Sequence, residues 1–414
     1  MHVAKAHLSR NSSMASTAIA AIFIVTFGLC LRPAWSQSII GDGRLVVPEA
    51  RTLQWASGVG NRELIENTYA RITRLTGTGP GSWPYEWMQV ASLFDRQGLA
   101  AAERRQAADA QQAYLKASLY YALGYFPDNA TPEQQASYRK HLETYIAASR
   151  FFSHTMEVVL IPLDEATVTV HLHVPLRASK PPLIVWNGGS DWWKASYHGA
   201  IEMLVRRGIA VAAFDLPGTG ESTAWVLGAD GGRLHRRVLD FLQDSGRFDF
   251  GRVGIIGVSL GGNYAVRTAA SEPRLKAAVN FCGPIHSVFQ MSAEARERVT
   301  ASADGAPFRA SARAGLDPRD PRPLGQRLDL IALGVVGPGK QIDIPILSVN
   351  GTRDLLAPVE DLELVRRSAP KGETWLLGTS GHCAIEYSRV VWPQVFDWLE
   401  EQLRAAGQRE AARP

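Results

Sequence analysis

The sequence contains few cysteines and no long apolar segment. Only three of its 414 residues are cysteine, which excludes a scaffold built on disulfides. Two of them, Cys282 and Cys383, lie beyond the N-terminal region, and they could either pair in an oxidising compartment or remain as buried thiols. The apolar run at residues 18–31 is shorter than the roughly 20 residues that a membrane-spanning helix requires.

Clusters of one charge and cofactor-binding motifs are also absent. The chain has 44 Lys and Arg against 40 Asp and Glu, and no run of Lys or Arg predicts a nucleic-acid-binding surface. His and Cys residues lack zinc-site spacing, and no G-x-G-x-x-G motif opens a strand–helix unit. The Gly-rich turn at residues 214–222 lacks the Lys of a phosphate-binding loop. We therefore expect no nucleic acid, metal or cofactor.

The N-terminal segment, residues 1–36, has the pattern of a secretory signal peptide. Lys5 and Arg10 precede the apolar run, and residues 34–36 read Ala-Trp-Ser, with small residues where signal peptidase requires them. A retained single membrane anchor is the alternative, but the shortness of the run favours cleavage. The sequence thus predicts export to a bacterial periplasm or secretion, with no stable membrane anchor after cleavage.

The hydrophobic pattern changes once after this segment. Residues 37–153 begin as an extended lead-in and then show helical spacing of apolar residues, which predicts an N-terminal module of four helices. Residues 154–405 open with a hairpin and then alternate short apolar strands with amphipathic helices. That alternation is typical of a mostly parallel sheet covered by helices on both faces. Residues 406–414 are polar and are expected to be disordered.

One interval, residues 286–343, breaks the strand–helix alternation. It contains no strand pattern, and its middle is rich in proline. A long insertion between two strands of a compact domain is more often a lid over a site than a structureless loop. We therefore expect a lid insertion here.

The motif Gly257-Val-Ser259-Leu-Gly261 lies between an apolar strand pattern and a helical pattern. A nucleophile elbow needs small residues two places before and after the serine, because the strand-to-helix turn has no room for side chains. The helix start also favours negative charge that develops at the serine oxygen. The strand before the motif and the helix after it make the motif specific, although its letters alone are common.

A serine nucleophile needs a base, and the base needs an orienting acid. Asp354 follows the predicted strand at residues 346–349, and His382 follows the predicted final strand. This gives the chain order Ser, Asp, His that such an elbow requires. Glu360 and Asp361 are rival acids, but they already lie in the next predicted helix.

The loop after the predicted strand at residues 183–186 reads Asn-Gly-Gly-Ser-Asp-Trp-Trp. An oxyanion needs two N–H donors, so we expect one from Leu260 and the other from Gly189 or Ser190, where glycine allows close approach of the backbone. Candidates for substrate contacts are Asp191, Trp192, Trp193 and His286. The alternatives are a helix cap for Asp191, packing for the tryptophans, and a hydrogen bond to backbone for the histidine.

These motifs resemble the α/β-hydrolase superfamily and, within it, the FrsA-like esterase family. The resemblance is carried by residues 252–289 and by the loop NGGSDWWKAS, and it extends over the helical module. It implies an α/β-hydrolase fold with an N-terminal helical module and a lid insertion. The family includes carbon–carbon bond hydrolases of the dihydroxypseudooxynicotine hydrolase type and fungal pigment chain-shortening hydrolases. In the carbon–carbon hydrolases an acid at the position of Asp191 is implicated in catalysis. The family loop commonly reads Gly-Gly-Leu-Asp/Glu-Ser, from which Ser190 and Trp192 depart.

Taken together, the sequence predicts a serine hydrolase for a small-molecule carboxylic ester with an aromatic or bulky group, acting through an acyl-enzyme. One alternative is hydrolysis of a carbon–carbon bond in an acyl-aromatic ketone. A second alternative, of another class, is a binding or regulatory protein with an idle hydrolase domain. The sequence leaves the oligomeric state open, including a homodimer.

Overall fold

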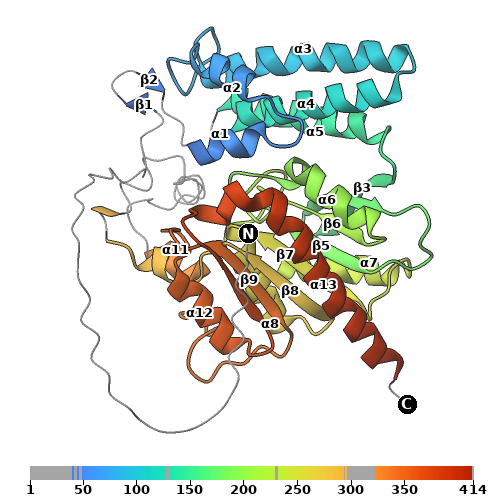
Figure 1. The fold of residues 1–414 in the computed structure, drawn as a ribbon, viewed down its shortest axis with the longest axis vertical. Helices are drawn as coiled ribbons and strands as arrows, with labels where there is room; N and C mark the ends of the chain where they lie inside the picture. The colour runs from blue at the N-terminus through green and yellow to red at the C-terminus, as the bar shows by residue number, and fades with distance from the viewer. Residues whose placement is uncertain are drawn as a thin grey trace, which may run out of the picture.

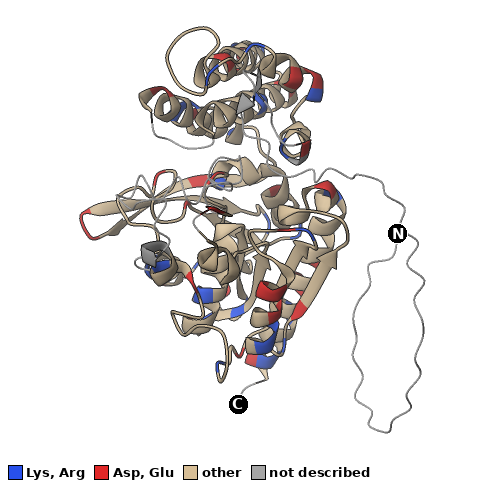
Figure 2. Cartoon of the chain, turned by 90° about the vertical axis from the view of Figure 1, so that its left-hand side faces the viewer, with Lys and Arg blue, Asp and Glu red and all other residues tan. Residues whose placement is uncertain are grey.

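The computed structural model describes residues 40–41, 44–45, 49–126, 131–228, 232–292, 294–295 and 322–412. The predicted signal peptide and the middle of the predicted lid lie outside these residues. Among the helices that are described, none combines the length and the apolar character needed to cross a membrane. In Figure 2, basic and acidic residues are interspersed over the described chain, in line with its near-neutral balance of charges.

An eight-stranded sheet organises the C-terminal part of the chain. The strand order is β10-β9-β8-β7-β5-β6-β4-β3. Strands β5 to β10 pair in parallel, while β4 pairs antiparallel with both β6 and β3. The bounds are β3 (Thr155–Leu163), β4 (Ala166–Val174), β5 (Leu183–Asn187), β6 (Ala210–Ala213), β7 (Val253–Val258), β8 (Leu275–Phe281), β9 (Ile346–Gly351) and β10 (Glu373–Leu377). The mostly parallel sheet predicted from the apolar runs is therefore confirmed.

Helices cover both faces of this sheet, because alternate side chains of the central strands point to opposite sides. Val185 and Ile255 pack on one face with α7 (Arg233–Asp244), α8 (Leu260–Ser271) and α12 (Val359–Ser368). On the other face, Ile184, Trp186 and Ile256 pack with α6 (His198–Arg206) and α13 (Ser388–Ala411). Figure 1 shows this arrangement of layers.

Helix α13 is longer than expected. It continues to Ala411, whereas the sequence predicted disorder from residue 406. The physical reason is burial, since Leu403 and Ala406 are only 1% and 5% exposed. The polar residues that led to the prediction lie around these buried positions.

The N-terminal module contains five helices in its described part, one more than expected. They are α1 (Glu49–Ala56), α2 (Arg62–Tyr69), α3 (Trp83–Glu103), α4 (Ala107–Tyr125) and α5 (Pro132–Ser149). Helix α1 lies in the segment predicted to be extended. Its Trp55 is fully buried against the rings of Trp83 and Phe126, and this packing holds the short helix in place. The module lies over the loops at the carboxyl ends of the sheet strands (Figure 1).

The two described ends of the predicted lid interval pack into the domain. A short 3₁₀ helix, η2 (Ser287–Gln290), lies near its start, and α11 (Arg322–Leu328) lies near its end. Beyond α11 the chain forms turns whose Leu330, Val336 and Ile342 are buried in the core of the sheet face that α7 covers. The lid role of the interval stays a prediction.

Candidate active site

The tight turn between β7 and α8 carries Ser259. This residue has φ 54° and ψ −127°, a conformation that costs free energy for any residue with a side chain. A Cβ atom on Gly257 would collide with the backbone of Gly261, and one on Gly261 would collide with the carbonyl of Gly188. The small residues around the serine are therefore required by the turn, as the motif predicts.

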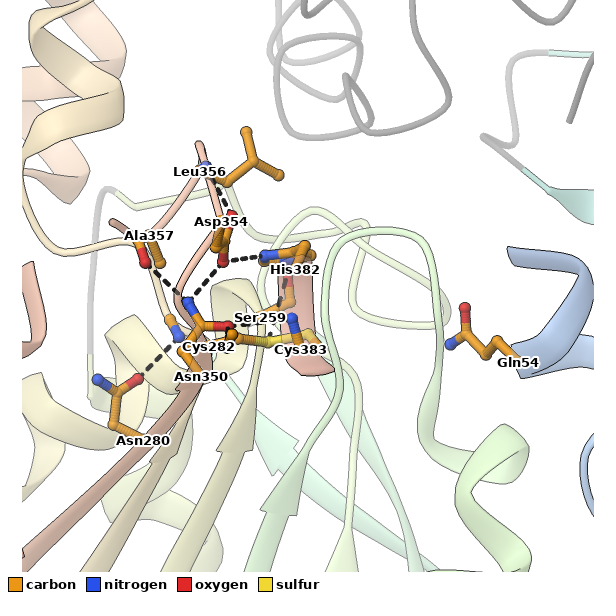
Figure 3. Close-up of a disulfide and its surroundings, with 12 residues drawn as sticks. Gln54, Ser259, Asn280, Cys282, Asn350, Asp354, Leu356, Ala357, His382 and Cys383 are labelled. Atoms are coloured by element: carbon orange, nitrogen blue, oxygen red, sulfur yellow. Dashed lines mark hydrogen bonds and ion pairs between the residues drawn. A yellow bond between two sulfur atoms is a disulfide. The ribbon is translucent and has the colours of Figure 1, made fainter. Parts of the chain in front are cut away.

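The structure brings Ser259, His382 and Asp354 into one hydrogen-bonded chain (Figure 3). The Oγ of Ser259 lies 2.9 Å from Nε2 of His382. The Nδ1 of His382 lies 2.6 Å from Oδ2 of Asp354. Three separate loops, after β7, β9 and β10, supply these residues at the carboxyl ends of their strands.

Further hydrogen bonds hold Asp354 in its charged form. Burial alone would raise the pKa of its carboxyl group, but the neighbouring His382 and hydrogen bonds from Asn350 and Leu356 lower that pKa overall. The side-chain amide of Asn350 donates at 2.6 Å, and the backbone N–H of Leu356 donates at 2.7 Å. The ionised carboxylate is thus well placed to orient the imidazole and to stabilise its positive charge.

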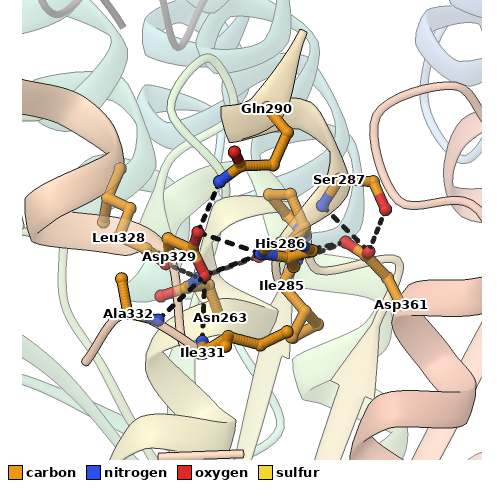
Figure 4. A network of polar contacts seen from close by, with 11 residues as sticks. Asn263, Ile285, His286, Ser287, Gln290, Leu328, Asp329, Ile331, Ala332 and Asp361 are labelled. Carbon is orange, nitrogen blue, oxygen red and sulfur yellow. Dashed lines mark hydrogen bonds and ion pairs between the residues drawn. The ribbon is translucent and has the colours of Figure 1, made fainter. Parts of the chain in front are cut away.

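The carboxylate of the rival acid Asp361 binds backbone N–H groups near the start of the predicted lid interval. Its carboxylate accepts hydrogen bonds from the backbone N–H groups of Ile285, His286 and Ser287 (Figure 4). The side chain of His286 lies 2.9 Å from Oδ2 of Asp329. His286 is not among the residues that line the cavity described below, and its side chain contacts a carboxylate rather than the backbone, so the structure supports neither the substrate contact nor the hydrogen bond to backbone.

Cys282 and Cys383 form a disulfide, one of the two states that the sequence left open. Their Cα atoms are 4.8 Å apart, and 101 positions separate them along the chain. The bond joins the end of β8 to the loop that carries His382 (Figure 3). It therefore fastens the imidazole loop to the sheet beside Ser259.

Gly189 lies directly beside the serine. A Cβ atom built on Gly189 would be 3.0 Å from the Cβ of Ser259 and 3.3 Å from its Oγ. Only glycine leaves this space open without a shift of the neighbouring atoms. Ser190 is buried in the same loop. Leu260, which directly follows Ser259, is the first residue of α8. Gly189 and Leu260 thus adjoin Ser259, and the oxyanion role of these two residues and of Ser190 stays a prediction.

Asp191 does not cap the following helix, which was the alternative that the sequence left open. Its Oδ2 accepts a hydrogen bond from Nη2 of Arg51 at 2.7 Å, and both side chains are 8% exposed. Arg51 belongs to α1, so the helical module supplies the countercharge for the loop. Sequence reasoning missed Arg51, although Pro48 and Glu49 are a signal for the start of a helix just before it.

Lys194 belongs to a different buried network. Its Nζ lies 2.6 Å from Oδ2 of Asp215 and 2.7 Å from Oε2 of Glu221. Burial acts to lower the pKa of Lys194, but the two carboxylates raise it overall. The hydroxyl of Tyr138, on α5, donates to Asp215 at 2.7 Å. This network ties the loop after β5 to the loop after β6 and to the module.

The two tryptophans of the loop differ in their surroundings. The ring of Trp193 is 3.9 Å from the ring of Tyr125, centre to centre, and Trp193 does not line the cavity. The structure therefore favours the packing alternative for Trp193. Trp192 packs with the aromatic cluster around Trp55 and also lines the cavity.

A cavity of about 850 Å³ lies between the module and the sheet, within the range of small-molecule sites. Ser259, His382, Gly189 and Asp191 line its catalytic end. Its apolar walls come from both parts of the chain and include Leu115, Leu119, Met203, Val258, Phe281, Ile385 and Trp392. Polar side chains, among them Arg51, Gln111, Gln112 and Tyr145, line other parts of the wall.

The fold and the arrangement of these residues define an α/β hydrolase. The model of the family described as "Esterase FrsA-like" matches residues 65–404, and the chain belongs to this family. The chain is a hydrolase, and the names of its relatives indicate hydrolysis of esters.

Relatives and solved structures agree with this assignment. Esterase FrsA of Photobacterium profundum is 27% identical over 346 residues, which cover 80% of this chain and 79% of the relative. Esterase FrsA of Yersinia pestis (strain Pestoides F) is 27% identical over 350 residues, which cover 83% and 80%. The fold is similar to that of 2,6-dihydroxy-pseudo-oxynicotine hydrolase, with a TM-score of 0.66 and 20% identity over 86% of this chain and 96% of that one. It is also similar to that of AbyA5, with a TM-score of 0.66 and 21% identity over 86% and 98%.

Proposed function

We propose that the chain is a serine hydrolase that cleaves a carboxylic ester through an acyl-enzyme. The observation that carries the proposal is the hydrogen-bonded chain from Ser259 through His382 to Asp354 at one end of a cavity. This arrangement supplies a nucleophile, a base and an orienting acid in contact with one another.

In the proposed reaction, the Oγ of Ser259 attacks the ester carbonyl carbon while Nε2 of His382 takes the hydroxyl proton. The N–H groups of Leu260 and of Gly189 or Ser190 stabilise the negative oxygen of the tetrahedral intermediate. The imidazolium then gives its proton to the leaving alcohol, and the acyl-enzyme remains. Water, deprotonated by His382, attacks the acyl carbon and releases the acid and the free serine.

The proposed substrate has an aromatic or bulky group. Five aromatic residues line the cavity, namely Tyr145, Trp192, Tyr197, Phe281 and Trp392, and such surfaces bind flat apolar groups well. The cavity volume also exceeds what a short acyl ester needs. A panel of p-nitrophenyl and naphthyl esters of increasing size tests this proposal, with kcat/KM expected to rise with size. A panel in which acetate esters are the best substrates would contradict it.

Hydrolysis of a carbon–carbon bond is a second candidate, and the position of Asp191 favours it. This carboxylate lines the cavity next to Gly189, close to where a substrate carbonyl must lie. Its ion pair with Arg51 fixes the position of the carboxylate in the wall of the cavity. Comparison of Asp191→Asn with the wild type on an ester and on an acyl-phenol ketone distinguishes the two. A selective loss of ketone hydrolysis would support the carbon–carbon reaction, and parallel losses would support a general role of the residue.

The third reading, an idle domain that only binds a partner, has no support from these contacts. An uninterrupted Ser259–His382–Asp354 chain and membership of an esterase family both favour an active enzyme. We also propose export of the chain, and the disulfide between Cys282 and Cys383 supports it, because disulfides persist in oxidising compartments.

Covalent labelling tests the assignment of the nucleophile. A fluorophosphonate probe is expected to label the wild type and to leave Ser259→Ala unlabelled. Ser271→Ala, an exposed serine in the last turn of the same helix, is the matched control and should label normally. Labelling that persists in Ser259→Ala would refute the assignment.

A further inference from the structure

Two cysteine sulfurs and an imidazole nitrogen meet at the end of β8. The Sγ atoms of Cys282 and Cys383 and a ring nitrogen of His382 lie within 4.8 Å of one another. The Sγ of Cys282 is 4.0 Å from Nε2 of His382. Cys282 is fully buried, whereas His382 and Cys383 line the cavity. A small solute in the cavity can therefore approach this cluster from one side.

We propose that reduction of the disulfide opens a site for a thiophilic divalent cation, such as Zn²⁺ or Co²⁺, held by Cys282, Cys383 and His382. A bound cation occupies the Nε2 lone pair and so inhibits the enzyme. The inhibition rests on the proposed role of His382 as the base, whereas the binding of the cation does not.

The distances suit a tetrahedral ion. Zinc–sulfur bonds of about 2.3 Å and zinc–nitrogen bonds of about 2.0 Å place two sulfurs about 3.8 Å apart and a sulfur and a nitrogen about 3.5 Å apart. The separation of 4.0 Å between Cys282 Sγ and His382 Nε2 is close to this value. Reduction then requires the two sulfurs to separate by side-chain rotation. Two thiolates and one imidazole, with a fourth position for water, form an established zinc ligand set.

One ligand is already oriented for the metal. The Nδ1 of His382 is hydrogen bonded to the carboxylate of Asp354 at 2.6 Å. This bond places the ring proton on Nδ1 and leaves the lone pair on Nε2. A carboxylate in this position is the usual partner of a metal-binding histidine. The same contact that prepares the base for catalysis therefore prepares it as a ligand.

A phosphine can supply the two electrons that reduction of the disulfide requires. The phosphine and one water convert the disulfide into two thiols, and the phosphine leaves as its oxide. Binding of the divalent cation then releases two protons and forms two thiolate bonds. In the oxidised chain the two sulfurs are bonded to each other and cannot act as thiolate ligands. The disulfide therefore prevents metal binding at this cluster.

Cobalt titration of the folded full chain tests the site. Protein reduced with tris(2-carboxyethyl)phosphine and freed of reductant under argon is titrated with Co²⁺. Thiolate-to-cobalt charge-transfer absorption is expected to saturate at one equivalent, and oxidised wild type should show none. Cys383→Ser should lose the absorption. Asp354→Asn should weaken binding by roughly 10-fold to 100-fold, and His382→Ala by at least a similar factor. His286→Ala, which changes a histidine outside the cluster, is the control and should bind as the wild type does.

Absence of the absorption in the reduced wild type would overturn the proposal, and so would unchanged affinity in His382→Ala. Loss of native circular dichroism on reduction would also overturn it, because the site requires the folded chain. In parallel, Zn²⁺ should inhibit ester hydrolysis only in reduced protein, and a chelator should reverse the inhibition. Cobalt binding together with an inactive oxidised enzyme would refute the proposed function and leave the metal site standing.

Discussion

We predict that removal of the buried ion pair between Arg51 and Asp191 destabilises the folded protein. The two side chains come from the helical module and from the loop beside Ser259, and each is 8% exposed. Arg51→Met keeps most of the side-chain volume but removes the positive charge. Asp191 is then left as a buried carboxylate without this partner.

The expected cost follows from this burial. Removal of one partner of a buried ion pair typically destabilises a protein by about 3–5 kcal/mol, because the remaining charge is uncompensated. Arg51 also lies over the ring of Phe126, with its guanidinium carbon 5.6 Å from the ring centre, and a methionine keeps part of that contact. We therefore expect a loss near the lower end of the range, about 3 kcal/mol.

Urea unfolding followed by tryptophan fluorescence measures this change. The matched control is Arg62→Met in the neighbouring helix, since Arg62 pairs with Glu49 and Glu66 at the surface. Pairs of this kind contribute little, so the control should unfold at nearly the same urea concentration as the wild type. The double variant Arg51→Met/Asp191→Asn should recover part of the loss, because it leaves no buried charge unpaired.

Three outcomes would refute this reasoning. Equal midpoints for Arg51→Met and Arg62→Met would mean that the buried pair contributes no more than a surface pair. A double variant less stable than Arg51→Met alone would mean that Asp191 has another compensating partner. An unchanged kcat/KM in Arg51→Met would show that the loop at Gly189 keeps its position without the pair, since we expect a clear decrease.

Three further predictions concern pH and the other buried groups. Burial lowers the pKa of several histidines between the module and the sheet, to about 4 for His141 and His198, so the unfolded chain binds protons near pH 5 that the folded chain does not. The free energy of unfolding should thus decrease from pH 6.5 towards pH 4, by up to about 1.4 kcal/mol per pH unit for each such histidine; a urea midpoint that is equal at pH 7 and pH 5 would contradict this. Lys194→Met should destabilise by about 3–5 kcal/mol, because Asp215 loses its buried countercharge, whereas a change as small as that of the exposed Lys371→Met would exclude the predicted role. Asp354→Asn should lower kcat by roughly four orders of magnitude through the wrong imidazole tautomer, with KM little changed, and a rate near that of the wild type would remove Asp354 from the mechanism.

Much of the fold follows from local patterns in the sequence. The short, largely apolar runs of β5 and β7 are typical of central strands, and the turn at Ser259 demands its glycines. Helix α1 was missed because its eight residues are too few for a periodic signal. The burial of Trp55 among rings from α3 and the end of α4 stabilises it, and such tertiary packing overrides weak local preference.

Part of the candidate site was also predictable from the sequence, and part was not. The order of Ser259, Asp354 and His382 along the chain was sufficient to group them, because each follows a recognisable strand. The partner of Asp191 was not predictable, since Arg51 lies 140 residues away in another structural unit. Lys194, only three residues from Asp191, instead pairs with Asp215 and Glu221, and its own side chain is fully buried. A charge in such a position binds where its desolvation is best compensated, and sequence distance has no influence on that.

The loop after β5 shows how the module and the hydrolase fold depend on each other. The indole of Trp192 packs into the aromatic cluster of α1, α3 and α4 while it lines the cavity. Trp193 packs against Tyr125 and Tyr138 on α4 and α5, and Asp191 is paired with Arg51 on α1. Three consecutive residues thus anchor the candidate oxyanion loop to the module through two rings and one ion pair. A change in the module that alters this packing must therefore also move Gly189 relative to Ser259, so substrate preference and module sequence are expected to vary together.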